Sequence, residues 1–119
     1  MQLRQAAENY LATIYAIQID KEKVRSIDIV KALNYSRPTI SIAMRNLREH
    51  KVITMDARGV ISMTAKGKKI AQNIYKRRTA LRDVLVQKGV SAKTAAQDAA
   101  KIEYDLSEES YQAIVSALA

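Results

Sequence analysis

The chain has 119 residues, of which 48% are hydrophobic, and it contains no Phe, no Trp and no Cys. This length suits one domain better than two. The missing cysteines exclude disulfides, thiolate metal sites and cysteine nucleophiles, and one Pro with three Gly argues against a turn-rich all-β fold. No apolar run approaches ~18 residues and no signal peptide is recognisable, so we predict a cytoplasmic protein without a membrane span.

The net charge of +8 is unevenly distributed along the chain. Residues 21–50 carry seven basic and three acidic side chains, and residues 51–82 carry nine basic side chains and one acidic one. Residues 83–119 carry three basic and six acidic side chains. A basic mid-chain indicates a polyanionic partner, although a solvated surface that only favours solubility is the alternative.

The first third of the chain predicts two amphipathic helices. Residues 2–19 place apolar side chains at helical spacing. A shorter helix is expected over 27–33, with Ser26 as its cap and Asn34 in a left-handed conformation after it. The expected inner face of this short helix consists of Ile27, Val30 and Leu33.

The stretch "YSRPTISIAMRNLREH" predicts a second helix, which Ser36 caps and whose first turn holds Pro38. Its apolar face consists of Ile40, Met44 and Leu47. At about 100° per residue, the opposite side gathers polar side chains within about 80° of each other: Arg37, Ser41, Arg45 and Arg48. Two short helices joined by "NYS" are typical of a helix-turn-helix.

A small hairpin is predicted next, with strands at Val52–Met55 and Val60–Met63. The turn "DARG" places Gly59 where a positive φ is needed and puts Arg58 at the tip. This hairpin would form a wing beside the helix-turn-helix.

The last half of the chain predicts three helices. Thr64 caps a long one over 65–88, which Gly89 ends, and Ser91 and Ser107 cap helices over 92–106 and 108–118. The expected apolar stripes of the last two are Ala95, Ala99, Ile102 and Leu106, and Tyr111, Ile114, Val115 and Leu118.

This order of elements resembles the diphtheria-toxin-repressor family of metal-dependent regulators, and most closely its shorter manganese-regulator branch. The resemblance is carried by "ENYLATIYAI", "VRSIDIVKALNYSRPTISIAMRNLREHKVI", "RGVISMTAKGKKIA", "RRTALRDVL" and "AAKIEYDLS". It implies a mainly α fold, with a winged helix-turn-helix DNA-binding domain over 1–75 and a helical dimerisation region over 76–119. It also implies that no third domain follows.

The resemblance places DNA contacts at the start of the recognition helix and in the wing. Arginine there can bind guanine or phosphate, hydroxyls can bind phosphate or base, and Ile42 offers an apolar surface to a thymine methyl group. The candidates are Ser36, Arg37, Pro38, Thr39, Ser41, Ile42, Arg45 and Arg58. For each arginine, and for Lys66, Lys68 and Lys69, an ordinary solvated charge is the alternative.

The family's metal site is where this chain departs from the resemblance. The family holds a divalent metal with carboxylates and histidines on the first, long and fifth helices. At the matching positions this chain has Asn9, Ala12, Arg78, Ala100, Glu103 and Tyr104, of which Glu103 alone keeps the usual ligand. Imidazole and carboxylate are what such metals need, so we predict no metal cofactor and an Arg78–Glu103 pair in place of the cation. An altered site for manganese or iron, using Glu8, Asp105 or Glu108, is the alternative.

The sequence therefore predicts a transcriptional regulator that binds double-stranded DNA as a homodimer on a pseudo-palindromic operator, with repression the expected action. We expect no enzyme, no small-molecule substrate and no membrane partner, since the chain lacks a glycine-rich phosphate loop and the metal-hydrolase pattern "HExxH". Two alternatives stay open: a metal-responsive repressor with an altered site, and a helical module that binds a protein or an anionic surface.

Overall fold

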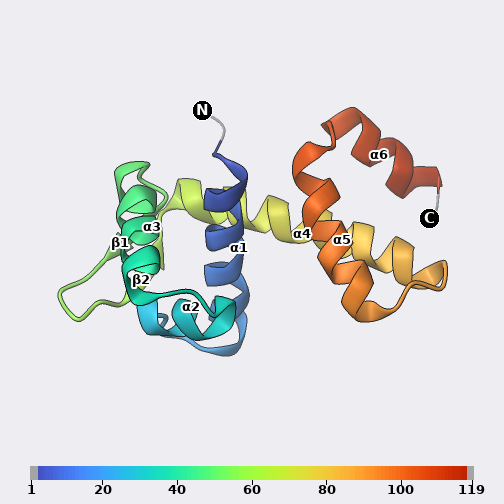
Figure 1. Cartoon of the computed structure of the whole chain (residues 1–119). Helices are drawn as coiled ribbons and strands as arrows, with labels where there is room; N and C mark the ends of the chain where they lie inside the picture. Colours follow the sequence, from blue (N-terminus) through green and yellow to red (C-terminus); the bar gives the residue numbers. More distant parts are fainter. Residues whose placement is uncertain (1–2, 118–119) are drawn as a thin grey trace. The chain divides into compact units, whose positions relative to one another are not determined.

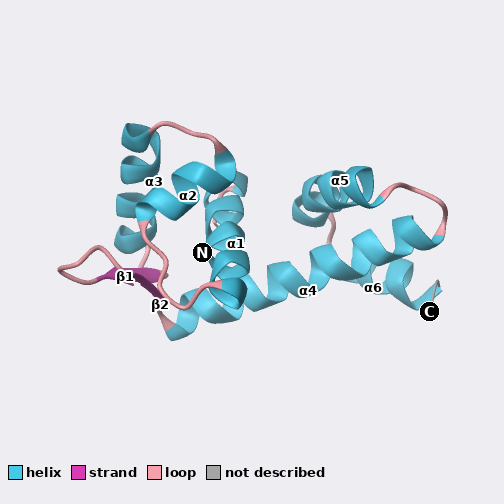
Figure 2. Ribbon diagram, turned by 90° about the horizontal axis from the view of Figure 1, so that it is seen from below, coloured by secondary structure: helices cyan, strands magenta, loops and turns pink. Residues whose placement is uncertain are grey.

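The computed structural model describes residues 3–117, which form six helices and one two-stranded sheet (Figures 1 and 2). The chain divides into two compact units, Met1–Gln72 and Asn73–Ala119. The elements are α1 (Gln5–Asp20), α2 (Ser26–Leu33), α3 (Arg37–Glu49), β1 (Ile53–Met55), β2 (Ile61–Met63), α4 (Ala65–Gln87), α5 (Ala92–Asp105) and α6 (Glu108–Ala117). The fold is mainly α and of the winged helix-turn-helix type, as the sequence predicts. Residues 2 and 118 of the predicted helices lie outside the described residues.

The first unit is built on an aliphatic core shared by α1, α2, α3 and the hairpin. The chain has no Phe or Trp, so this core is filled by Leu, Ile and Val side chains and one Met, all with almost no solvent exposure. The members are Leu11, Ile14, Val24, Ile29, Ile40, Met44, Leu47, Val52, Ile53 and Ile61. α1 begins at Gln5, three residues later than predicted, and ends at Asp20.

α2 differs from its prediction in two details. It begins at Ser26, so Arg25 occupies the N-cap position, and the carboxylate of Asp28 accepts the Arg25 N–H at 2.9 Å. The predicted capping role of Ser26 is therefore wrong. Ile29 is the fully buried residue of this helix, whereas Ile27 is only half-buried. The reason is that α2 packs against both α1 and α3, so its buried face is wider than the single predicted stripe.

The ends of α2 and α3 are set by local chemistry. Asn34 adopts a left-handed conformation (φ 57°) and ends α2, as predicted. Ser36 Oγ accepts the N–H of Thr39 at 3.3 Å, and Pro38 lies in the first turn of α3. These features fix the turn of the helix-turn-helix.

The hairpin pairs β1 and β2 antiparallel, with Ile53 opposite Met63 and Met55 opposite Ile61. Each strand is one residue shorter at its start than predicted. Gly59 has a φ of 79° in the connecting turn, where Asp56 Oδ1 accepts the N–H groups of Arg58 and Val60. The Ile61 N–H also donates to the Val24 carbonyl at 2.7 Å, which attaches the wing to the body of the unit.

The second unit has a smaller core of Leu81, Ala99 and Tyr111, with Leu106, Ile114 and Val115 packed against it. Ser91 and Ser107 cap α5 and α6 as predicted, accepting the N–H groups of Thr94 and Ser110. The predicted stripe of α5 is partly wrong. Ile102 is 41% exposed, and the buried stripe is Ala95, Ala99 and Glu103, because this helix buries a paired carboxylate.

Candidate nucleic-acid interface

α3 has one buried face and one polar exposed face. Ile40, Met44 and Leu47 are at most 1% exposed and anchor the helix to the core of the first unit. The side chains predicted to share the opposite face are all exposed: Arg37, Ser41, Arg45 and Arg48. A rigid helix that presents guanidinium and hydroxyl groups to solvent matches the chemistry needed to bind phosphate and base edges.

The N-terminal turn of α3 is exposed and pre-ordered. The Ser36 and Thr39 hydroxyls lie 2.7 Å apart, and both residues are exposed together with Pro38. Ile42 is 59% exposed although it is large and apolar. The first turns of α3 therefore present hydroxyl, apolar and cationic groups together.

A cleft of about 230 Å³ lies beside this turn. Its lining includes Ser26 and Ile27 from α2 and Arg37 and Ser41 from α3. Hydroxyl and guanidinium donors at one cleft are suited to a phosphate oxygen.

The wing presents Arg58 at its tip. Arg25 Nε donates to the Arg58 carbonyl at 3.2 Å, so the backbone of the tip is attached to the start of α2 while the Arg58 side chain stays exposed. Arg48 NH1 lies 3.9 Å from the sulfur of Met55 in the wing. Arg48 therefore contacts the wing.

The start of α4 adds three exposed lysines, Lys66, Lys68 and Lys69. Thr64 caps this helix by accepting the Gly67 N–H at 3.0 Å, as predicted. Cations in the first turn oppose the helix dipole, so these lysines slightly lower the stability of α4.

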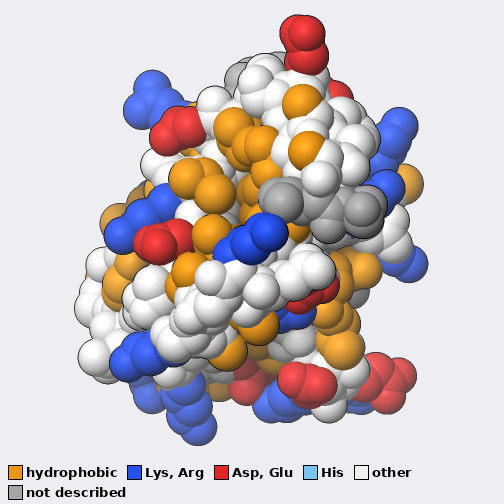
Figure 3. Space-filling view, turned by 90° about the vertical axis from the view of Figure 1, so that its right-hand side faces the viewer, with side chains coloured by type: hydrophobic (Ala, Val, Ile, Leu, Met, Phe, Trp, Pro, Cys, Tyr) orange, Lys and Arg blue, Asp and Glu red, His pale blue; other side chains and the backbone are white. Residues whose placement is uncertain are grey.

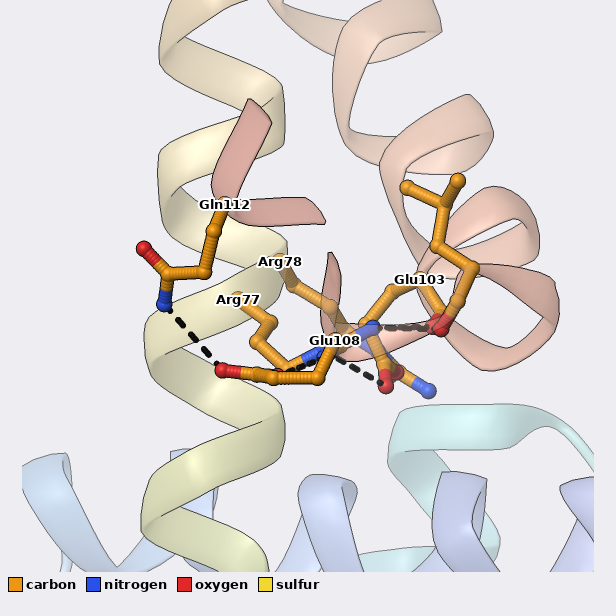
Figure 4. Close-up of polar contacts among 6 residues, drawn as sticks. Arg77, Arg78, Glu103, Glu108 and Gln112 are labelled. Carbon is orange, nitrogen blue, oxygen red and sulfur yellow. Dashed lines mark hydrogen bonds and ion pairs between the residues drawn. The ribbon is translucent and has the colours of Figure 1, made fainter. Parts of the chain in front are cut away.

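The second unit contains a buried polar cluster of α4, α5 and α6 (Figure 4). Arg78 Nε lies 3.2 Å from Oε1 of Glu103, so the ion pair expected from the sequence is present. Arg77 Nε lies 3.6 Å from the other carboxylate oxygen. The side chains of Arg77 and Glu103 are 8% and 6% exposed, which makes this a buried two-arginine site around one carboxylate.

The sequence did not distinguish Arg77 from the neighbouring cations Lys76, Arg78 and Arg82 as the residue at the centre of this cluster. The Arg77 guanidinium donates to the carbonyls of Glu103 and Leu106 and to the carboxylate of Glu108, and it lies 4.6 Å from the centre of the Tyr111 ring. A signal for it existed, because position 77 continues the spacing of Ile70, Ile74 and Leu81 along the apolar stripe of α4.

The donor set of α4 and α5 does not fit a divalent metal. Arg78, Ala100 and Tyr104 supply neither imidazole nor carboxylate, and two guanidinium groups already neutralise Glu103. Glu108, one of the carboxylates of the alternative altered site, is bound by Arg77 and Gln112. Within residues 3–117, no group of three or more His, Cys, Asp or Glu side chains is arranged to hold a metal ion.

Comparison with known proteins finds one matching family model and several similar regulators. A sequence profile described as the iron dependent repressor, metal binding and dimerisation domain, matches residues 64–119. The transcriptional regulator MntR of Escherichia coli is 28% identical over 110 residues, covering 92% of this chain and 71% of the relative. Residues 64–119 are thus similar to this repressor domain, and most of the chain is similar to the MntR regulators.

Two further relatives are also named as transcriptional regulators. MntR of Salmonella typhimurium is 26% identical over 95% of this chain and 72% of its own length. An uncharacterised helix-turn-helix regulator of Methanocaldococcus jannaschii is 27% identical over 90% of this chain and 87% of its own length.

Two solved structures share the fold of this chain. The manganese regulator SloR superposes with a TM-score of 0.82 at 21% identity, covering 99% of this chain and 54% of that one. The IdeR protein of T. acidophilum gives 0.79 at 22% identity, covering 98% and 55%. The chain therefore spans about half the length of these two structures.

Proposed function

We propose that this chain is a DNA-binding transcriptional regulator, and a repressor, that binds a pseudo-palindromic operator as a homodimer in the cytoplasm. In this proposal residues 1–75 are the DNA-binding domain, residues 76–119 are the dimerisation region, and the protein is not an enzyme. The related proteins are named as transcriptional regulators and repressors, which supports this assignment.

The observation that carries the proposal is the two-sided construction of α3. Arg37, Ser41 and Arg45 are exposed on one side, while Ile40 and Met44 fix the helix from the other. We assign DNA contact to the first turns of α3 and to the wing tip, with Ser36, Pro38, Thr39, Ile42 and Arg58 completing the surface. Arg48 is a weaker candidate because it contacts Met55.

Dimerisation is assigned to the second unit. Val86 and Ile102 are 43% and 41% exposed although both are large and apolar. Figure 3 shows hydrophobic side chains that reach the surface among charged ones. Contact with a second copy would remove such groups from water, at a gain of about 25 cal/mol for each Å² of apolar surface buried.

We further propose that DNA binding needs no metal ion. Arg77 and Arg78 already supply positive charge to Glu103, so a divalent cation would have to displace two guanidinium groups from a buried carboxylate. Titration calorimetry with manganese, iron(II) and zinc tests this part. We expect no stoichiometric binding, and submicromolar affinity for one ion per chain would contradict it.

The experiment that tests the function is sedimentation of the chain with random-sequence duplex DNA in EDTA, followed by selection of the bound sequences. We expect a dimer that binds duplex at low salt and releases it at high salt. The selected sequences should contain two inverted half-sites about 10 base pairs apart. A monomer that leaves the duplex unbound at low salt would contradict the proposal.

A further inference from the structure

A cavity of about 330 Å³ lies between α1 and α3, on a side of the recognition helix that the DNA-binding proposal does not use. Leu3, Ala6 and Ala7 line it from the N-terminal end of the chain, and Ala43 lines it from α3. Three alanines at the meeting of two helices leave the space open, where larger side chains would fill it. Its volume lies at the lower end of the roughly 300–1,000 Å³ range of small-molecule sites.

The lining combines an apolar body with a cationic edge. Tyr10 supplies an aromatic wall, and its ring packs edge-on against Tyr35 with the ring centres 6.3 Å apart. Arg4, Asn46 and His50 supply the polar edge. The described residues that line the cavity include no Asp or Glu, so its charge complements an anion.

The polar groups are suited to a carboxylate in particular. Arg4 is exposed and forms no ion pair within the described part of the chain, and its planar guanidinium matches a carboxylate in two-point geometry. Ala6 and Ala7 lie in the first turn of α1, which has no side-chain cap but holds the buried Glu8, so Arg4 and not the helix end supplies the positive charge of this edge. An aromatic ring beside Tyr10 would gain the usual offset or edge-to-face contact.

We propose that this cavity binds a small aromatic carboxylate and that its occupation changes DNA binding, an inference that rests on the proposed function. α3 is the route between the two sites. Ala43 and Asn46 line the cavity, and Ile42 and Arg45, their immediate neighbours in sequence, face solvent on the proposed DNA surface. Tyr10 also contacts Tyr35, which precedes the capping residue Ser36. A ligand between α1 and α3 therefore shifts the helix that carries the DNA-reading side chains.

Binding is tested by titrating the full chain with benzoate while amide NMR signals are followed. The neutral isostere benzamide and the small anion acetate separate the roles of charge and ring. We expect benzoate to shift the amides of Ala6, Ala7, Ala43 and His50, and both comparison compounds to bind at least about fivefold more weakly. Absence of binding up to about 20 mM, or shifts spread over Arg37 and Arg45 as for any anion, would overturn the site.

Variants locate the site and separate it from bulk charge. Arg4→Gln should weaken benzoate binding at least about threefold, and Ala6→Leu should abolish it by filling the space, because both residues line the cavity. Lys93→Gln removes the same charge from an exposed position of α5 and should bind benzoate as the unmodified chain does. Unchanged binding by Ala6→Leu would also overturn the site.

Regulation is tested separately, by measuring duplex affinity with and without saturating benzoate. Coupled sites typically change each other's affinity by about 5–150-fold, and we expect a change within this range that Ala6→Leu removes. Benzoate binding with unchanged duplex affinity would overturn the regulatory role. If the chain binds benzoate but does not bind DNA, the proposed function is contradicted and the proposed benzoate site is not.

Discussion

The Nε atom of Arg78 lies 3.2 Å from Oε1 of Glu103, at two positions where the family resemblance implies metal ligands. The Arg78 side chain is 20% exposed and that of Glu103 is 6% exposed. A fixed positive charge thus stands beside the one family carboxylate that this chain retains, and Arg77 adds a second. The polar cluster of the second unit can be ordered without an ion from solution.

Glu103→Gln tests how much the second unit depends on this cluster. Removing the carboxylate leaves two guanidinium groups without their shared partner, and Arg77 is almost fully buried. We expect the free energy of unfolding to fall by about 3 kcal/mol in urea titrations. Asp83→Asn is the control, because its pair with Arg82 is exposed and should be worth less than ~1 kcal/mol. Equal effects of the two substitutions would contradict a buried role for Glu103.

Ile40 and Ile42 form a matched pair on α3, with exposed fractions of 0% and 59%. Ile40→Ala should cost about 2–5 kcal/mol of stability because it leaves a cavity in the core. Ile42→Ala should change stability by less than ~0.5 kcal/mol and should weaken binding to selected operator DNA. Thermal unfolding and fluorescence anisotropy measure the two effects, and intact DNA affinity of Ile42→Ala would remove this residue from the interface.

Gly67 allows the start of α4 to approach the backbone at Val52. A Cβ atom at position 67 would lie 1.9 Å from the Val52 carbonyl oxygen. Gly67→Ala should therefore destabilise by about 1–3 kcal/mol, although alanine is otherwise the better helix former. A Cβ atom at position 59 would have no atom within 4 Å, but the φ of 79° is unfavourable for alanine. Gly59→Ala should therefore lower the stability of the wing alone, by about 1–2 kcal/mol. Hydrogen exchange should show the first effect in α4 and the second in the hairpin alone.

Asp28 gives the first unit a pH-dependent stability. The hydrogen bond from Lys21, and after it the one from the Arg25 N–H, lower the pKa of Asp28 below the ordinary 3.8. A lowered pKa in the folded state means that this stability is present above pH 3.8 and is lost as the pH falls through the folded-state value. Asp28→Asn should cost about 1 kcal/mol at pH 7, and the difference should shrink below pH 3.8. A constant difference between pH 7 and pH 2.5 would contradict this origin.

The parts of the fold that the sequence predicted are those set by near neighbours. Ser36 caps α3, Asn34 ends α2 and Gly59 turns the wing, because each depends on residues within four positions along the chain. The wrong predictions depend on distant packing. Ile29 rather than Ile27 is fully buried because α2 packs against two other helices.

The polar cluster of the second unit likewise combines features set by near neighbours in sequence with features set by distant packing. The sequence "KRR" offers three similar cations at 76–78, and the family position drew attention to Arg78. The place of Arg77 is set by α5 and α6, whose carbonyls and carboxylates it binds. The exposed position of Ile102 follows from the burial of its neighbour Glu103. Which arginine of α3 binds phosphate and which reads a base depends on the DNA, and this too lies beyond the local pattern.

The most direct test of the central claim is the salt dependence of duplex binding by Arg37→Ala and Arg45→Ala, with Lys93→Ala as an exposed control outside the interface. Each arginine that holds a phosphate should lower the log–log salt slope by ~0.9 when it is removed. An arginine that reads a base should instead lose about 1–3 kcal/mol of affinity for the selected operator with the slope unchanged. We predict that both arginine variants bind more weakly than the control in one of these two ways. Variants that keep the affinity and the slope of the unmodified chain would contradict DNA binding through this face of α3.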